Sequence, residues 1–380
     1  MWLTIILLIA VVISALALAM TIANLGRYRS PPEAGPQVHA EQAVLLSICI
    51  PARNEAANLE PCVRSLLGQS HRALEVVVYD DQSTDETPEI LARLIAGDSR
   101  VRAVPTVPLP PGWVGKQWGC DQMGRAATGE WLLFTDADVR FAPTCLERTL
   151  AESSRSGADL LSTFPQEITG SLGEALLIPL IHFILFSYLP MGRMRATSDP
   201  SASAGCGQFL FARRSAWLEV GGHSAWRTSM HDGIRMPRAF RAAGRRTDLF
   251  DGTTLVSCRM YRGFLATWRG FAKNAYEGLG SVWLLILLTV LHLTGHVLPW
   301  VVLAIAPWSG ISIAETALIA IAIVLQLSQR VLLASRFRQS FTSALLHPIG
   351  VLLMTAVQWY SLGLQVTGRR GWKGRGGAPA

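Results

Sequence analysis

The chain has 380 residues, a formal net charge of +7 at pH 7, and a composition that is 50% hydrophobic. This apolar share is too large for a purely soluble enzyme, and the polar loops are too many for a membrane bundle alone. We therefore expect a soluble domain joined to several membrane segments. Nucleic-acid binding is disfavoured, because no basic stripe interleaves with exposed aromatic residues.

Residues 1–25 predict an N-terminal transmembrane helix. Trp2 to Asn24 carry no charge, and this stretch is long enough to cross roughly 30 Å of hydrocarbon. No basic region precedes it and no small-residue cleavage site stands out, which favours an anchor over a cleaved signal. Arg27 and Arg29 follow at once. Because basic residues flank the cytoplasmic side of membrane helices, they place Met1 outside and the next domain in the cytoplasm.

After a linker at residues 26–43, residues 44–278 alternate strands with helices, the pattern of βαβ units and a mainly parallel sheet. The expected strands are Leu45–Ile50, Glu75–Tyr79, Val101–Val104 and Trp131–Phe134. The expected helices are Asn58–Leu67, Thr87–Ala96 and Gln122–Ala127, the last after a proline-rich loop from Pro105 to Lys116.

Two acidic clusters follow two of these strands, one from Asp80 to Asp85 and one at Asp136-Ala137-Asp138. The carboxyl ends of parallel strands form the sheet edge at which open α/β domains bind ligands. The Asp136 and Asp138 side chains lie on one side of an extended backbone, so they can converge on one cation. Such oxygen ligands suit Mg²⁺ or Mn²⁺, which neutralise phosphate oxygens. The clusters therefore predict a site for a metal-bound diphosphate, with Asp85 assigned to a helix N-cap.

Two further loops belong to this edge. Pro51-Ala52-Arg53-Asn54-Glu55 follows the first strand and places a cation and a carboxylate there. Gly112-Trp113-Val114-Gly115-Lys116 supplies flexible backbone and one ammonium group, which is suited to gripping phosphate.

Residues 171–190 predict an apolar helix that opens with Ser171 and Glu174 at capping-box spacing. The helix is short for a bilayer span. The pattern leaves open whether it lies in the membrane interface beside the site, which we prefer, or is a buried core helix.

Residues 279–368 predict three membrane segments, near 281–304, 310–333 and 342–366. The arginines between the last two segments belong inside, but simple alternation then sends the basic tail at 369–380 outside. One C-terminal segment is therefore expected to be re-entrant or interfacial. All six cysteines fall in the predicted cytoplasmic part without a Cys-x-x-Cys pair, which predicts reduced, mostly buried thiols.

Taken in order, these residues resemble the nucleotide-sugar-binding half of family 2 glycosyltransferases of the GT-A fold, over roughly residues 44–275. Five elements occur in register: the Pro-Ala-Arg-Asn-Glu loop, Asp-Asp-x-Ser-x-Asp, Gly-Lys, Asp-x-Asp, and a later Gly-Gly…His-Asp. The resemblance implies that the donor nucleotide sugar is held by Pro51, Arg53, Glu55, Asp81, Lys116 and Asp136. It assigns Asp138 to the metal.

The second half of the domain looks like the acceptor side of that family, with Gly207 and Gln208 in its acceptor loop. By the resemblance Asp232 is the catalytic base, which deprotonates an acceptor hydroxyl as that oxygen attacks the anomeric carbon. A single displacement of this kind inverts the anomeric centre. His231, also on the acceptor side, stands where most members carry Glu. The alternative from spacing alone is that His231 and Asp232 cap a helix at 233–243.

Trp268 and Arg269 have two roles open to them, contact with donor or acceptor and anchoring of an interfacial helix. They lie where processive polysaccharide synthases of the family carry Gln-x-x-Arg-Trp, a signature absent here in that form.

The order of anchor, catalytic domain, apolar helix and C-terminal membrane segments resembles the membrane-bound carotenoid- and hopanoid-associated glycosyltransferases. This resemblance implies a multi-pass protein of the cell (inner) membrane with a cytoplasmic catalytic domain. It would move a hexose, with a divalent metal, from a nucleotide sugar such as a UDP-sugar to a hydroxyl of a lipid or polyisoprenoid. The alternatives are a polysaccharide synthase and a non-catalytic membrane assembly platform.

Overall fold

The computed structural model describes residues 1–33, 44–369, 371–372 and 375–376. They form two compact units. The sheet unit comprises Tyr28–Gln166, Met191–Arg259 and Gly368–Ala380, and the helical unit comprises Met1–Arg27, Glu167–Pro190 and Met260–Thr367. The expected linker (26–43) and basic tail (369–380) fall partly outside the described residues. The domain boundaries drawn from the sequence stay predictions.

The sheet unit is built on a seven-stranded sheet in the order β3-β2-β1-β4-β8-β6-β9. Its strands are β1 (Leu46–Ala52), β2 (Leu74–Asp80), β3 (Val101–Ala103), β4 (Trp131–Phe134), β6 (Leu160–Ser162), β8 (Leu210–Arg213) and β9 (Thr247–Leu249). β1 runs parallel to β2 and β4, whereas β8 is antiparallel to both of its neighbours. All of β1 is buried, as expected for a central parallel strand covered on both faces. The predicted mainly parallel α/β fold is confirmed.

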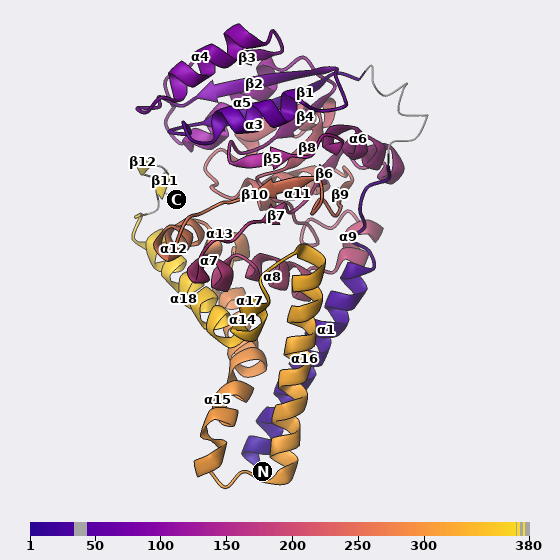
Figure 1. The fold of residues 1–380 in the computed structure, drawn as a ribbon, viewed down its shortest axis with the longest axis vertical. Coiled ribbons are helices and arrows are strands. Elements are labelled where there is room, and N and C mark those ends of the chain that lie inside the picture. Colours follow the sequence, from indigo (N-terminus) through magenta and orange to yellow (C-terminus); the bar gives the residue numbers. More distant parts are fainter. Residues whose placement is uncertain (34–43, 370, 373–374, 377–380) are drawn as a thin grey trace. The chain divides into compact units, whose positions relative to one another are not determined.

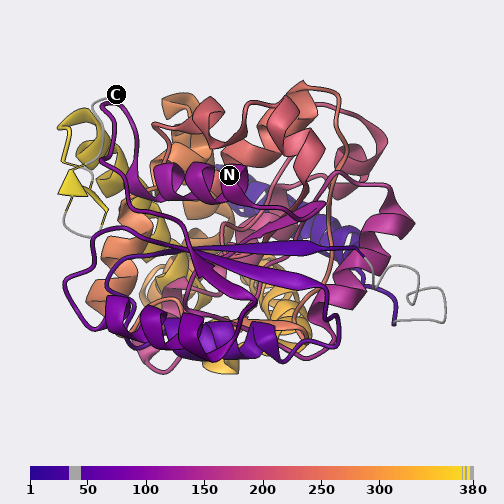
Figure 2. The same cartoon turned by 90° about the horizontal axis from the view of Figure 1, so that it is seen from above.

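Helices cover both faces of this sheet (Figure 2). The helices of the sheet unit are α3 (Leu59–Leu67), α4 (Thr87–Gly97), α5 (Gly115–Ala126), α6 (Cys145–Ser156), α9 (Met191–Ala196), α10 (Arg214–Glu219), the 3-10 helix η1 (Gly222–Trp226) and α11 (Asp232–Ala242). The short strands are β5 (Val139–Phe141), β7 (Gln166–Glu167), β10 (Val256–Cys258), β11 (Gly371–Trp372) and β12 (Arg375–Gly376). A core that includes Phe134 and Trp217 packs beneath α5. Five of the six cysteines are buried, in line with the prediction of mostly buried thiols, and Cys206 is half-buried.

Helix α5 begins well before Gln122, where the sequence predicted a helix. Val114 is extended, its N–H donates to the Arg227 carbonyl (2.8 Å), and the Trp118 N–H already donates to the Val114 carbonyl (3.0 Å). Lys116 therefore lies in the first helical turn rather than in a loop. A cation in a first turn opposes the helix dipole, so the local sequence hides this helix start.

The helical unit holds the predicted membrane segments. Its helices are α1 (Trp2–Leu25), α7 (Leu172–Leu177), α8 (Leu180–Tyr188), α12 (Phe264–Ala272), α13 (Ala275–Leu279), α14 (Val282–His292), the π-helix η2 (Leu293–Val297), α15 (Leu298–Ile305), the 3-10 helix η3 (Ala306–Trp308), α16 (Ile313–Phe337), α17 (Phe341–Leu345) and α18 (His347–Val366). In the described part of the chain, four stretches are long and apolar enough to cross a membrane: Trp2–Leu25, Val282–Trp308, Ile313–Phe337 and His347–Val366. The single N-terminal and three C-terminal segments are confirmed.

Helices α1 and α16 lie side by side and run in the same direction (Figure 1). Thr4 Oγ1 donates to Glu315 Oε1 (3.0 Å) near their N-terminal ends, and Gln329 Nε2 donates to Thr21 Oγ1 (2.8 Å) near their C-terminal ends. Interhelical hydrogen bonds of this kind stabilise helix pairs in an apolar solvent.

Helix α18 takes a course inclined to that pair (Figure 1). Its first turn contacts the π-helix through His347 and His296, whereas its last turns contact α12 and α13 through Tyr360 and Ser361. Such a course suits the segment expected to be re-entrant or interfacial.

The apolar stretch at 171–190 forms two helices, α7 and α8, divided at Pro179. The Ser171 hydroxyl accepts from the Glu174 N–H (3.3 Å), so the predicted cap is present. Helix α8 packs on α1, where the buried Asn24 amide donates to the Phe186 and Leu189 carbonyls. Within the helical unit this burial favours the core-helix alternative.

Candidate active site

The loops that follow β1 and β2 are tied to each other by reciprocal hydrogen bonds. The Asn54 N–H donates to Ser83 Oγ (2.9 Å), the Thr84 N–H donates to Asn54 Oδ1 (2.8 Å), and the Ala56 N–H donates to Asp85 Oδ2 (3.1 Å). Asn54 and Gln82 adopt left-handed backbone angles, with φ of 52° and 55°. Such conformations persist in non-glycine residues when the surroundings hold them, so the two loops form one preorganised wall.

Arg53 and Asp81 meet on this wall. Arg53 Nη1 donates to the Asp81 carbonyl oxygen (2.6 Å) and lies 3.7 Å from Asp81 Oδ2. Pro51 is buried in β1 beside Tyr79, and the Glu55 N–H donates to Thr87 Oγ1 (2.8 Å). Pro51, Arg53, Glu55 and Asp81, four of the residues expected to bind the nucleotide sugar, thus lie at one edge of the sheet. Asp85 accepts from the Thr87 N–H and hydroxyl at the start of α4, but the N-cap residue is Glu86, so the assignment of Asp85 to the N-cap was off by one residue.

Lys116 joins two carboxylates that are far apart in the sequence. Its Nζ lies 2.7 Å from Asp136 Oδ1 and 3.0 Å from Asp232 Oδ2. Lys116 comes from the first turn of α5, Asp136 follows β4, and Asp232 opens α11. The donor-side Asp-x-Asp and the expected base therefore share one ammonium group.

The same contacts set the charge states of the cluster. Burial would raise the pKa of Asp232, but the charge of the Lys116 ammonium and its hydrogen bond hold that pKa below its usual value. Burial would lower the pKa of Lys116, but Asp136 and Asp232 raise it well above the usual range. At neutral pH Asp232 is therefore an ionised carboxylate and Lys116 a cation.

Asp232 is the first residue of α11 rather than its N-cap, and only one of its two carboxylate oxygens bonds to the helix. Helix α11 has His231 at its N-cap, and the His231 side chain makes no capping hydrogen bond within the described chain. Asp232 Oδ1 accepts from the N–H of its own neighbour Gly233 (2.8 Å), while Oδ2 faces Lys116. This arrangement argues against the capping alternative.

Glycines let the loop at 205–207 pack directly on the start of α11. A Cβ on Gly207 would lie 2.2 Å from Asp232 Oδ1, and a Cβ on Gly233 would lie 2.5 Å from the Gly205 carbonyl oxygen. Any side chain at position 207 would therefore displace the carboxylate. Gly207, expected on the acceptor side, acts here by fixing the position of Asp232.

Asp138 is the residue whose chemistry best fits a divalent metal. Its Oδ1 is buried and has no hydrogen-bond partner among the described residues. Burial raises the pKa of Asp138 to about 7, with the carboxylates of Asp136 and Glu55 adding to the shift. A cation bound here would give this oxygen a partner and would reduce the repulsion between the carboxylates.

Among the described residues, no three Asp, Glu, His or Cys side chains are arranged to hold a metal by themselves. Mg²⁺ and Mn²⁺ in nucleotide sites commonly take one or two carboxylates and complete their coordination with phosphate oxygens and water. Asp138 and Asp136 have the side-chain chemistry for that role.

The remaining predicted residues have different surroundings. The buried Gln208 side chain contacts the thiols of Cys206 and Cys258. The main-chain carbonyl of Gln208 accepts from Thr135 Oγ1 (2.7 Å), so this residue supports the Asp-x-Asp loop. His231 is half-buried, and its N–H donates to Ser229 Oγ (3.0 Å).

Trp268 and Arg269 lie on α12, which belongs to the helical unit. Trp268 packs there against Phe264 and Tyr360. Contacts between helices of this unit favour the anchoring role for Trp268.

Two residues beside the carboxylates, Cys258 and His223, have no role predicted from the sequence. Cys258 is hydrogen-bonded to the Asp138 carboxyl, and its position in β10 could not be inferred without the pairing of β10 with β5. His223 is fully buried against Phe134 and Trp217. Burial lowers the pKa of His223 to about 3, so a neutral imidazole stands near Asp232. In the sequence, the two glycines directly before His223, Gly221 and Gly222, were the available signal for this residue.

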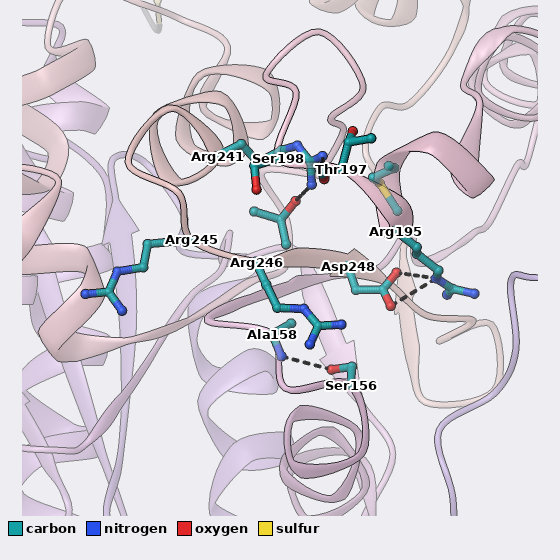
Figure 3. Close-up of a pocket in the computed structure, with 11 residues that line it drawn as sticks. Ser156, Ala158, Arg195, Thr197, Ser198, Arg241, Arg245, Arg246 and Asp248 are labelled. Carbon is teal, nitrogen blue, oxygen red and sulfur yellow. Dashed lines mark hydrogen bonds and ion pairs between the residues drawn. The ribbon is translucent and has the colours of Figure 1, made fainter.

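A separate hollow in the sheet unit is rich in arginine (Figure 3). Arg195 pairs with Asp248 (2.8 Å), and Arg245 pairs with Glu219. None of the predicted site residues lines this hollow. Its paired charges belong to the framework of the unit.

Comparison with known proteins agrees with the geometry. The family described as Glycosyl transferase family 2 matches residues 47–221. A 4,4'-diaponeurosporenoate glycosyltransferase of Staphylococcus haemolyticus is 27% identical over 277 residues, which are 70% of this chain and 69% of that protein. Glycosyltransferase AglD of Haloferax volcanii is 33% identical over 132 residues, which are 33% of this chain and 20% of that protein.

Among solved structures, the mannosyltransferase PcManGT of Pyrobaculum calidifontis, in complex with GDP-Man and Mn²⁺, aligns with a TM-score of 0.55 and 18% sequence identity. The alignment covers 95% of this chain and 98% of that one. At this identity the similarity establishes the fold.

Proposed function

We propose, on the premise that this chain is a member of glycosyl transferase family 2 and therefore a glycosyltransferase, that it moves a hexose from a nucleotide sugar to a hydroxyl on a membrane lipid or polyisoprenoid. The observation that carries this proposal is the ion-paired cluster in which Lys116 joins Asp136 to Asp232. It sets a donor-side carboxylate and an ionised base around one cation.

Asp232 acts as the general base. Its carboxylate removes the proton of the acceptor hydroxyl while that oxygen forms the new bond to the anomeric carbon and the nucleoside diphosphate leaves from the opposite face. A positioned carboxylate contributes about 10²–10⁴-fold to such a step. Lys116 compensates negative charge on the leaving diphosphate, and the product has inverted configuration.

On the donor side, the wall formed by the loops after β1 and β2 binds the nucleoside, with Arg53 and Asp81 as its polar contacts. Asp136 and Asp138 would hold a divalent metal. When bound, this metal supplies charge neutralisation on the diphosphate. The buried Asp138 oxygen without a partner supports this assignment.

The donor is proposed to be a UDP-sugar. PcManGT was solved with GDP-Man, so binding of UDP and GDP to the purified protein must be compared directly.

The acceptor is proposed to be a lipid, because four long apolar helices accompany the catalytic unit. The similar Staphylococcus protein is named for a carotenoid acceptor. The protein is proposed to lie in the cell membrane with its sheet unit in the cytoplasm. Arg27 and Arg29, directly after α1, support this orientation.

The test is transfer of label from a radiolabelled sugar nucleotide into lipid. Membranes containing the wild-type chain and Mn²⁺ should produce label that is extracted into organic solvent. Asp232→Asn should lose about 10²–10⁴-fold of this rate. A matched control is Asp248→Asn, which removes a carboxylate of the same unit from the arginine-rich hollow.

The product distinguishes the alternatives. Label in a long, water-soluble polymer would identify a polysaccharide synthase. Sugar nucleotide that binds but is never transferred, in the presence of extracted cell lipids, would favour an assembly platform. Mass spectrometry of lipids from cells with and without the active chain then gives the sugar and acceptor masses together.

A further inference from the structure

The helical unit contains a buried cluster of ionisable side chains to which the proposed transfer reaction gives no role. Half of the chain's 8 histidines lie in this unit, and all of these are buried together with Arg330. The cluster consists of His182, His292, His296, Arg330 and His347. Ionisable side chains inside apolar helix bundles are rare and usually mark a functional site.

Arg330 is the charged member, and its guanidinium is fully buried in α16. Its contacts are neutral, namely the Pro179 carbonyl (3.4 Å) and the Ser343 hydroxyl (2.9 Å). Among the described residues no carboxylate pairs with it, and its Nε has no partner. An isolated buried charge costs free energy of folding. An anion bound to this guanidinium would lower that cost.

Arg330 lies about 10 Å from the C-terminal end of α16, at roughly 1.5 Å per residue. Arginines near membrane interfaces usually extend along the helix surface to water, whereas the Arg330 side chain is buried within the helical unit. Arg336, on the same helix, is exposed. The inward course of Arg330 is therefore a specific feature of its position.

The histidines add hydrogen-bonding groups around the same point. Arg330 is within electrostatic range of His296 and His347, which contact each other with Nδ1 of His296 at 3.2 Å from Nε2 of His347. Phe183 packs against the cluster, with its centroid 4.9 Å from each of these two imidazoles and 6.0 Å from His292.

Several of these nitrogens have no partner in the described part of the chain: Nδ1 and Nε2 of His292, Nε2 of His296 and Nδ1 of His347. His292 and His296 flank or belong to a π-helix, and π-helices inside α-helices occur frequently at functional sites. The bundle thus presents several ring nitrogens without partners, some of which carry a proton and can donate, together with an unusual backbone at one place.

The charge of the cluster selects the class of ligand. A metal cation would be repelled by Arg330, and no metal-binding group of three side chains occurs in the described chain. A free inorganic anion would have to give up its water to enter an apolar bundle. An oxyanion carried on an apolar tail meets both requirements, because the tail suits the apolar helices and the head group suits Arg330.

We propose that Arg330, with His296 and His347, binds the oxyanion head group, carboxylate or phosphate, of a single lipid inside the helical unit. A narrow apolar hollow beside the cluster shows where the packing is loosest; it is lined by Leu180, Phe183, Ile184, His292, Val351 and Met354. Because the hollow is too narrow for a water molecule, binding requires Phe183 or its neighbours to move.

The test compares three probes with the same tail: oleate, oleoyl lysophosphatidate and oleyl alcohol. Each is added to the full-length protein in uncharged detergent, and the thermal unfolding temperature is followed against probe concentration. Oleate, lysophosphatidate or both should raise this temperature, and oleyl alcohol should not. A response to only one of the two acids identifies the carboxylate or the phosphate class.

The variants are Arg330→Gln, Arg330→Met and the matched control Arg336→Gln on the same helix. Arg330→Gln should weaken the response to the acidic probes about 10–100-fold, the range expected for lost hydrogen bonds to a charged group, and Arg336→Gln should leave it unchanged. The proposal is overturned if oleyl alcohol stabilises as much as the acids or if Arg330→Gln responds like the wild type.

A second measurement covers the case in which the variants differ in stability. Without probe, Arg330→Met should unfold at the same or a higher temperature than the wild type, because it removes an uncompensated buried charge. A large drop would show that Arg330 is a structural residue and would overturn the proposal. Since the readout is lipid binding rather than sugar transfer, it is independent of the proposed function.

Discussion

Lys116 Nζ lies 3.0 Å from Asp232 Oδ2, so an ammonium group from the first turn of α5 neutralises the carboxylate that opens α11. The same nitrogen lies 2.7 Å from Asp136 Oδ1. Binding of a diphosphate at Lys116 would therefore be felt directly by the base. The donor and acceptor halves of the site are coupled through one cation.

The first prediction concerns Lys116→Met. Lys116 opposes the effect of burial on Asp232, so its loss should raise the pKa of that carboxylate. A base must be ionised to act, and the acidic limb of the profile of kcat/KM against pH should therefore move to higher pH. Donor KM should also rise. A profile whose acidic limb stays in place would show that Lys116 does not set the charge of Asp232.

The second prediction concerns Gly207→Ala. The added methyl would stand 2.2 Å from Asp232 Oδ1 and must push the carboxylate out of place. Misplacement of a catalytic group by about 1 Å costs roughly 10²-fold in rate, so kcat should fall by about that factor while sugar nucleotide still binds. Gly97→Ala is the control, because its new methyl meets nothing within 4 Å. Full activity of Gly207→Ala would contradict the position given to Asp232.

The third prediction concerns metal activation and pH. The pKa of Asp138 is raised to about 7, so a proton competes with the metal below neutral pH and is absent above it. The Mn²⁺ concentration that gives half-maximal activity should fall as pH rises through neutrality and then level off. Asp138→Asn should weaken metal activation at every pH.

Stability provides a separate check of the same carboxyl. A group whose pKa is raised on folding stabilises the protein below its unfolded pKa, and this contribution is lost as pH rises through the folded value. As the pH rises from acidic to alkaline values, the thermal unfolding temperature of the metal-free wild type should therefore fall relative to that of Asp138→Asn. A constant difference across this range would place the titration elsewhere.

The fourth prediction concerns the nucleoside wall. Asp81→Asn should weaken the contact with Arg53 and raise donor KM by roughly 10–100-fold, the range for hydrogen bonds to charged groups, with a smaller change in kcat. Glu60→Gln is the control, since it alters an exposed pair with Arg64 on α3. Equal KM changes in both variants would show that the effect is general destabilisation.

Local patterns were sufficient for much of this protein. Several elements can be recognised from a short stretch of sequence alone. They are the uncharged run from Trp2 to Asn24, the apolar strands, and the clusters of Asp80 to Asp85 and Asp136 to Asp138. Burial on both faces of β1 requires a continuous apolar run, and a membrane helix requires a long one, so composition alone predicts these elements. The mainly parallel sheet and four apolar helices followed from such runs.

Other features depended on contacts between distant residues. The start of α5 is set by the Arg227 carbonyl, and Lys116 is tolerated in its first turn because Asp136 and Asp232 compensate its charge. Likewise, Gly207 looks like an ordinary loop glycine until α11 is packed against it.

The amino-acid sequence by itself determined the fold class, the membrane segments and the candidate carboxylates, because these depend on short-range periodicity and residue type. Only the tertiary structure decided that Lys116 joins Asp136 to Asp232, that Asp138 keeps a buried oxygen without a partner, and that Arg330 lies among histidines from several helices. The physical reason is that pKa shifts, steric contact and charge compensation depend on distances in space, which sequence separation does not fix.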